Sequence, residues 1–385
     1  WTKDTGGSGT VDISSAGTYS IPVSQGTYIV APNPSGIPSG YQAAYPSNLS
    51  HRVTVGSPCD PGGFAVQVGA SCSGGNVINL NFGFKLSDKW IQTRGTDIRD
   101  DNGGFDNVIP STAKVPPAAP GVCGVPFGDA FTSVNGTGGS PGIIFTGDTP
   151  AEFGAGSASS PNWKVGSVTY PDIYTPSKGI YTTSYAYVSG RIKQGGITST
   201  PITSETCGGS LASCTLNSMN TGAYNVNESL TINTFNGGAG GIFSSAKKII
   251  ILVNGDLTIK SNIIVPIGST LTFIVKGDIH IDKSIGTAWN SATTQVEGFY
   301  SADGSFYLDG NQDSCLTPDN RLNMAGSIIV NAGRKTPAGQ FVDNRTLCAN
   351  NSFCPVFTIA ERPDFVLNAP ESIKQIRTIY QEVAP

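Results

Sequence analysis

One seven-residue phrase recurs along this chain at short intervals. It reads V-N-G-D-L-T-I at 253–259 and V-K-G-D-I-H-I at 275–281, and related versions occur at 226–232, 296–302 and 324–330. A chain that repeats a phrase after about 22 residues is typically built from stacked units, because one such unit cannot bury its own apolar face. The repeat therefore constrains the fold more than any other feature of the sequence.

Within each copy, apolar and polar residues alternate, as Leu257 and Ile259 do around Thr258. Period two indicates a β-strand, and the glycine before it suits a tight corner. Equivalent strands that return after one coil stack about 4.8 Å apart as a parallel sheet. The predicted inward-facing core ladder consists of Leu230, Ile232, Leu257, Ile259, Ile279, Ile281, Ile328 and Val330.

These patterns predict an all-β chain whose larger part, 87–385, is a right-handed parallel β-helix, or β-solenoid, with long loop insertions. The regular coils are expected at about 224–332. A similar G-x-D-I pattern at Gly95 predicts that the solenoid begins near residue 90. Composition agrees with this fold class, because the 385 residues include 49 Gly and 25 Pro, and only 13% are charged.

Charge and hydropathy exclude two classes of partner. The formal net charge is −4, without a basic stripe, so nucleic acid is not expected to bind. No apolar run approaches the roughly 18 residues that a membrane-spanning helix needs. We therefore expect neither nucleic-acid binding nor a membrane span in this segment.

Eight cysteines point to an oxidising compartment. None is arranged as C-x-x-C, which argues against a zinc knuckle or a thioredoxin-like pair. An even number in loops favours disulfides and an extracellular location. Three couples lie close in sequence, but the connectivity stays open. The expected disulfide cysteines are the near couples Cys59 and Cys72, Cys207 and Cys214, and Cys348 and Cys354, together with Cys123 and Cys315.

The first 86 residues contain a second pattern, G-x-Y-x-x-x-V-x-x-G-x-Y-x-V, followed by G-Y and a closing F-G-F. Because of this pattern, residues 1–86 resemble the Cna-B-like, or carboxypeptidase-regulatory-like, modules of Gram-positive surface adhesins. The resemblance implies a small β-sandwich that serves as a stalk or spacer outside the cell. The matching residues are Gly17, Tyr19, Val23, Gly26, Tyr28, Val30, Gly40, Tyr41, Phe82, Gly83 and Phe84.

Nearly the whole chain also resembles large surface proteins of candidate-phyla-radiation bacteria (Patescibacteria). The residues that carry this resemblance are W-I-Q-T-R-G-T-D-I at 90–98, the N-G-D-L-T-I coil, and the R-P-D-F and Q-E-V-A-P phrases of the closing stretch at 362–385. It implies a cell-surface location and no known reaction.

Self-association is expected from the N-terminal region. Cna-B-like sandwiches normally have one or two strands before the G-x-Y strand, and here only a short stretch precedes Gly17. Either a longer precursor supplies the missing strand, or the open edge accepts a strand from another copy. The second alternative would join copies of the chain into a homopolymer or lattice.

Three places could carry chemistry. His280 alternates outward with Asp278 and Asp282, which suits a metal or acid/base site, although a solvated sheet face is the favoured interpretation. Two acidic loops offer oxygen ligands for calcium, against the alternative of ordinary Asp- and Asn-rich turns. The calcium candidates are Asp97, Asp100, Asp101, Asn102 and Asp106 in the first loop, and Asp309, Asn311 and Asp313 in the second.

The sequence thus favours a non-enzymatic extracellular structural protein, a subunit of a cell-surface layer or filament, with no catalytic residues and no cofactor beyond calcium. An adhesin that grips a host glycan or protein is the first alternative, because loop aromatics can stack on sugar rings. The same aromatics can equally pack onto the solenoid, which we favour. A carbohydrate-active β-helix enzyme is the second alternative. The aromatics concerned are Trp163, Tyr170, Tyr174, Tyr181, Tyr185 and Tyr187.

Overall fold

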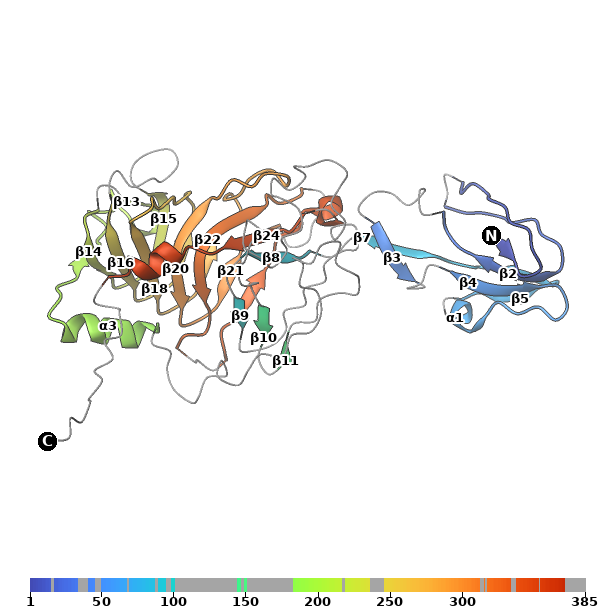
Figure 1. The fold of residues 1–385 in the computed structure, drawn as a ribbon, viewed down its shortest axis with the longest axis horizontal. Coiled ribbons are helices and arrows are strands. Elements are labelled where there is room, and N and C mark those ends of the chain that lie inside the picture. Colours follow the sequence, from blue (N-terminus) through green and yellow to red (C-terminus); the bar gives the residue numbers. More distant parts are fainter. Residues whose placement is uncertain are drawn as a thin grey trace, which may run out of the picture. The chain divides into compact units, whose positions relative to one another are not determined.

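The chain forms two compact units, Trp1–Ser87 and Asp88–Pro385, in a computed structural model (Figure 1). Strands dominate both units. Within the described ranges, no helix is long and apolar enough to cross a membrane. The structure describes residues 1–14, 17–33, 41–45, 50–67, 69–86, 89–94, 98–100, 144–146, 149–150, 183–216, 219–235, 246–311, 315, 317–333, 337–352 and 354–370.

The first unit is built from antiparallel strands. Its described sheets are β1-β2-β4, β3-β7 and β5-β6, and Tyr28, Val30 and Val53 form a buried core cluster. The alternation seen in the sequence over 17–31 is a strand only at Gly26–Val30, although Ile21 and Val23 still pack against this core. The elements are β1 (Thr2–Lys3), β2 (Gly26–Val30), β3 (Tyr41–Tyr45), β4 (His51–Val55), α1 (Gly63–Val66), β5 (Ser71–Ser73), β6 (Asn76–Ile78) and β7 (Gly83–Leu86).

In the second unit, successive strands alternate between two parallel sheets, which Figure 1 shows in colours from green to red, except for the blue-green β8 (Ile91–Arg94). Among the described residues, one sheet has eight strands in the order β12-β14-β16-β18-β20-β22-β24-β8. These are β12 (Thr200–Pro201), β14 (Gly222–Val226), β16 (Lys248–Val253), β18 (Thr270–Val275), β20 (Val296–Ala302), β22 (Leu322–Ile329), β24 (Phe357–Ala360) and β8 (Ile91–Arg94).

The other sheet, again counted over the described residues, has six strands in the order β13-β15-β17-β19-β21-β23. These are β13 (Cys214–Leu216), β15 (Leu230–Phe235), β17 (Leu257–Ile259), β19 (Ile279–Ile281), β21 (Phe306–Leu308) and β23 (Phe341–Asp343). The remaining elements are β9 (Ile98–Asp100), β10 (Ile144–Thr146), β11 (Thr149–Pro150), α3 (Tyr185–Gln194), η4 (Leu211–Ser213), η5 (Cys348–Ser352) and α4 (Pro363–Leu367).

The core lies between the inner faces of these two sheets. On the six-stranded sheet, Leu230 pairs with Leu257 and Leu257 with Ile279, while Ile232, Ile259 and Ile281 form the next row. All six side chains are at most 1% exposed. Alternation at period two therefore places one apolar face inward, as expected for strands.

Two residues of the expected core ladder, Ile328 and Val330, lie elsewhere. Ile328 is on β22 of the eight-stranded sheet, where it pairs with Tyr300, and Val330 directly follows that strand. The positions that continue the six-stranded row after Ile279 belong to Phe306 and Phe341. The expected register was therefore wrong for the last two copies, although Ile328 and Val330 are buried.

The cause of this error is a second set of glycines. Gly298 and Gly326 lie inside β20 and β22, pair with one another and have positive φ angles. The corner glycines that follow Gly277 are instead Gly304 and Gly339, in A-D-G-S-F-Y-L at 302–308 and P-A-G-Q-F-V-D at 337–343. In the sequence, a glycine inside a strand therefore cannot be distinguished from a glycine at a corner.

The segment near residue 90 does not begin the stack. β8 pairs in parallel with β24, so it extends the sheet beyond the last coil, at the end opposite β12. The prediction that the solenoid begins near residue 90 is therefore wrong. This segment joins the eight-stranded sheet next to β24, the strand of the last coil.

A helix covers part of the outer face of the eight-stranded sheet. Helix α3 buries Val188 and Ile192 against Ala223, Ile250 and Leu252. Its Tyr185 and Tyr187 pack against the same cluster. These two tyrosines therefore pack onto the sheet, as favoured from the sequence; Trp163, Tyr170, Tyr174 and Tyr181 lie outside the described residues.

Candidate functional site

His280 stands on the outer face of the six-stranded sheet, between two coils. Its Nδ1 is 3.0 Å from Oδ1 of Asp309, and both side chains are 33% exposed. The ring stacks on Tyr307, with the ring centroids 4.5 Å apart and the planes within 7° of parallel. Because β19 and β21 are adjacent, this pair connects one coil to the next.

The charges around His280 favour its protonated form. The hydrogen bond with Asp309 is the largest cause that raises the pKa of His280, partial burial acts against it, and the nearby charges of Asp309, Asp278 and Asp256 add to the increase. The protonated imidazole of His280 is therefore stabilised by the Asp309 carboxylate.

The other carboxylates of this face already bind neighbouring groups. Asp278 accepts a hydrogen bond from the backbone N–H of Ser305 at 2.7 Å. Asp282 accepts one from the N–H of Ser284 at 2.9 Å, and its Oδ2 lies 3.5 Å from Nζ of Lys260. The predicted row of Asp278, His280 and Asp282 thus exists, and its carboxylates connect coils and turns.

The calcium candidates are only partly described. Asp309 pairs with His280, and the Asn311 side chain bonds Lys283 and the Thr317 carbonyl. Asp100 lies on β9, and in the described part of the chain no three His, Cys, Asp or Glu side chains converge as a metal site. The candidates Asp97, Asp101, Asn102, Asp106 and Asp313 lie outside the described residues.

Every cysteine that the structure describes is in a disulfide. Cys59 bonds to Cys72, and Cys207 to Cys214, which are two of the near couples. Cys348 bonds to Cys315 and not to its near neighbour Cys354, which is itself in a disulfide. Proximity in the sequence therefore suggested the wrong partner for Cys348. The fold brings it together with Cys315, which lies 33 residues earlier. Cys123 lies outside the described residues.

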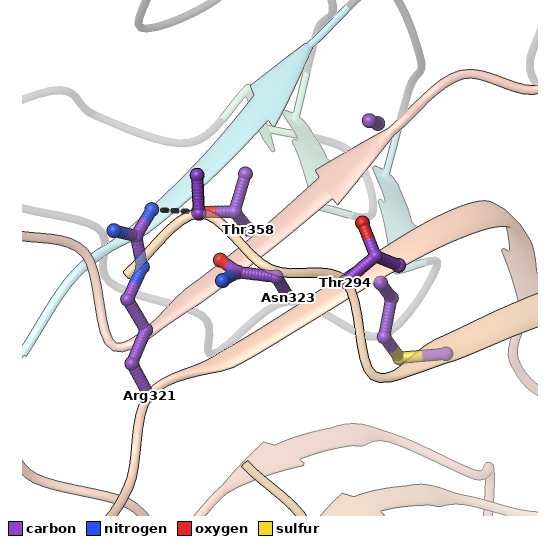
Figure 2. Close-up of a pocket in the computed structure, with 7 residues that line it drawn as sticks. Thr294, Arg321, Asn323 and Thr358 are labelled. Carbon is purple, nitrogen blue, oxygen red and sulfur yellow. Dashed lines mark hydrogen bonds between the residues drawn. The ribbon is translucent and has the colours of Figure 1, made fainter. Parts of the chain in front are cut away.

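A small polar cavity of about 30 Å³ lies on the outer side of β22 and β24 (Figure 2). Arg321 is fully buried there, and its Nη2 donates to Oγ1 of Thr358 at 2.8 Å. Figure 2 shows the Asn323 amide directed toward the side of Arg321 and Thr358. The lining residues are Ala292, Thr294, Arg321, Asn323, Met324, Thr358 and Ala360.

Asn323 has a fixed orientation in this cavity. Its Nδ2 donates to the carbonyls of Ser291 at 3.0 Å and Thr293 at 3.1 Å, and the side chain is only 4% exposed. Its Oδ1 is buried and accepts no hydrogen bond from the described residues. A buried acceptor without a hydrogen-bond donor is unusual in a folded protein.

Sequence reasoning missed Arg321, Asn323 and a third buried polar residue, Arg345. The available signal was a charged or amide residue next to apolar strand positions, as in N-R-L-N-M at 320–324. That signal does not separate a buried side chain from one on a solvated face. Comparisons with protein-family models, with curated proteins and with solved structures found no match to this chain.

Proposed function

We propose that the chain is a non-enzymatic extracellular structural protein, a subunit of a cell-surface layer or filament. The finer fold assignments belong to this proposal: a Cna-B-like β-sandwich in residues 1–86 and a right-handed parallel β-helix in residues 87–385. The resemblances of the sequence to surface proteins support it.

The observation that carries the proposal is the continuous register of the two parallel sheets. β14, β16 and β18 pair residue by residue, and so do β15, β17 and β19. In such a stack each coil binds only its neighbours, and the result is a stiff scaffold of quasi-one-dimensional form. Disulfides such as Cys207–Cys214 and Cys315–Cys348 are compatible with an oxidising location.

Three of the described sheet edges do not favour strand addition between copies. β12 is two residues long and ends in Pro201, which has no N–H to donate. In the first unit, the edges of the β1-β2-β4 sheet are bridged by Ser8 at Thr2 and by Asp60 at Thr54. Short or covered edges limit edge-to-edge pairing. We therefore expect the proposed assembly to use lateral contacts or another edge.

Electron microscopy of native surface material, with an antibody raised against this chain, tests the proposal. We expect label on a regular lattice or filament, and assembly of the purified full-length chain at high concentration. Label confined to isolated particles, or turnover of a polysaccharide by the purified chain, would argue for a different function.

A further inference from the structure

The segment that follows β24 turns back over earlier strands of the eight-stranded sheet. In the pairing register, Ala360 of β24 stands beside Ala325 of β22, and Ala325 stands beside Glu297 of β20. Arg362 follows Ala360 by two residues, yet its Nη1 donates to Oε2 of Glu297 at 2.9 Å. The chain therefore reaches past β22 and binds β20, the second strand along the sheet.

The same arginine also binds the connection between β17 and β18. Its Nη2 donates to the Val265 carbonyl at 3.0 Å, and the Val265 N–H donates to Oε2 of Glu297 at 2.7 Å. Nε and Nη2 of Arg362 each donate to one carboxylate oxygen of Asp364 at 2.8 Å. The N–H of Gly268, two residues before β18, is also bonded to Asp364. One guanidinium and its partner carboxylate therefore join the continuation of β24 to two earlier coils.

Burial strengthens these contacts. The side chains of Arg362 and Glu297 are only 15% and 13% exposed. Phe365 belongs to the same buried core cluster as Val265, and the Arg362 guanidinium lies 4.2 Å from the centre of its ring. The hydrogen bonds from Arg362 lower the pKa of Asp364, so this pair is charged at neutral pH. Charge-assisted hydrogen bonds are stronger than neutral ones, and water screens them little when they are mostly buried.

We propose that residues 362–365 form a clasp that locks the last coils together, so that the strands β18, β20, β22 and β24 open as one unit. In a plain stack each coil contacts only its neighbours, and a coil near the end can open alone. Here Arg362 follows β24 by two residues, so β24 cannot leave the sheet while the clasp holds β20 and the connection before β18. The clasp does not depend on the surface-layer or filament role proposed above.

Hydrogen exchange of the full-length chain, measured by mass spectrometry, tests the clasp. Arg362→Met keeps an apolar stem and removes the donors. We expect the amides of β18, β20, β22 and β24 to exchange together roughly tenfold faster or more, which is the effect of losing one charged hydrogen bond. β14 and β15 lie toward the other end of the stack and should keep their rates. An increase confined to 357–368 would overturn the proposal, because the clasp would then couple no other strand.

Lys260→Met is the matched control. Nζ of Lys260 lies 3.5 Å from Oδ2 of Asp282, and this pair joins only the neighbouring strands β17 and β19. The lysine side chain is 45% exposed, and exposed pairs of this kind contribute little. The variant should therefore exchange as the unmodified chain does. If it accelerates exchange in β18 to β24 as much as Arg362→Met, the coupling is not a property of the clasp and the proposal fails.

Asp364→Asn is a milder second variant. It removes the charge that faces Arg362 and leaves the contact of Arg362 with Glu297 in place. We expect faster exchange in the same four strands, by a smaller factor than in Arg362→Met. If Arg362→Met does not fold, Asp364→Asn decides. A folded Asp364→Asn chain in which β18 to β24 exchange at the unmodified rate would exclude the clasp.

Discussion

The backbone N–H of Asp278 donates to Oδ1 of Asp256 at 2.9 Å, so a side chain of one coil holds the corner of the next. The same contact recurs along the stack. Asp278 Oδ1 accepts from the N–H of Ser305 at 2.7 Å, and Ser305 Oγ accepts from the N–H of Gln340 at 3.0 Å. Ser229 Oγ begins the series by accepting from the N–H of Asp256 at 2.9 Å. The residue after the corner glycines Gly255, Gly277 and Gly304 is Asp or Ser, whose short oxygen-bearing side chain reaches the backbone of the next coil.

Gly277→Ala should destabilise the chain. A Cβ at this position would lie 2.0 Å from Oδ1 of Asp256 and 2.8 Å from the carbonyl of Gly255, so the corner must open. Overpacking of this kind typically costs about 1–3 kcal/mol in the free energy of unfolding. Gly190→Ala is the matched control, since Gly190 lies in α3 with open space around it and should be neutral or slightly stabilising in the same chemical denaturation series. Equal losses in the two variants would contradict the corner argument.

The sequence predicted the strand period, the parallel stacking of the middle coils and the corner glycine because these are local properties. Gly255 and Gly277 stand 22 residues apart in almost identical phrases. The later coils were misread because Gly298 inside β20 gives the same local signal as a corner glycine. The position of β8 beside β24 depends on a pairing between distant segments, which no local period records.

The polar sites were harder to predict than the fold. His280 was visible as an outward residue, but its partner Asp309 comes from the next coil, 29 residues later. Burial of Arg321 and Asn323 depends on the loop that precedes β20, whose carbonyls accept from them. The choice between a solvated and a buried polar residue is therefore made by long-range packing, which the alternation pattern does not encode.

Arg345→Met should destabilise the chain strongly. Arg345 is fully buried, and its guanidinium donates to the backbone carbonyls of Ile285 at 2.6 Å, Asp282 at 2.9 Å and Asp309 at 3.0 Å. Methionine keeps most of the volume but leaves these acceptors without their donor, at about 1–3 kcal/mol for each buried group that water does not reach. Thermal unfolding measures the loss.

Lys283→Met is the control for this arginine. Lys283 is exposed in the same region, and its Nζ bonds only the side chain of Asn311 in the described structure. Exposed contacts of this kind contribute about 0–1 kcal/mol. If the thermal unfolding midpoint of Arg345→Met is as high as that of Lys283→Met, the guanidinium of Arg345 does not hold these backbone segments together.

Ile259→Asp should prevent folding, whereas Thr258→Asp should not. The two residues are adjacent on β17, but Ile259 is fully buried in the core and Thr258 faces outward. An unpaired carboxylate in an apolar core costs several kcal/mol, while one on the outer face stays in water. Circular dichroism and soluble yield separate the outcomes, and a folded Ile259→Asp chain would contradict the assigned register.

Non-reducing peptide mapping should recover the pairs that the described part of the chain shows, Cys59–Cys72, Cys207–Cys214 and Cys315–Cys348, and a linked peptide that contains Cys354. Thiol titration of the denatured, unreduced chain should find no free cysteine, since none is free in the described structure. Recovery of a Cys348–Cys354 peptide would instead support the pairing suggested by sequence proximity. Two or more free thiols would undo the argument for an oxidising compartment.

His280 should make stability depend weakly on pH. Its folded pKa is raised above the unfolded value of about 6.5, chiefly by Asp309, so its contribution is fully present below pH 6.5 and is lost as pH rises through the folded pKa. The stability difference between the unmodified chain and His280→Gln should therefore be largest near pH 5 and vanish at high pH. Because both side chains are one-third exposed, we expect less than about 1 kcal/mol.

NMR titration of the His280 ring gives the direct measurement of this shift. The unmodified chain should titrate above pH 6.5, and Asp309→Asn should titrate lower because the principal partner has lost its charge. Asp278 and Asp256 remain in both proteins and supply the smaller part of the effect, while Tyr307 keeps its stacking contact. A ring that titrates at the same pH in both proteins would show that the 3.0 Å contact between His280 and Asp309 does not carry the charge interaction that connects the two coils.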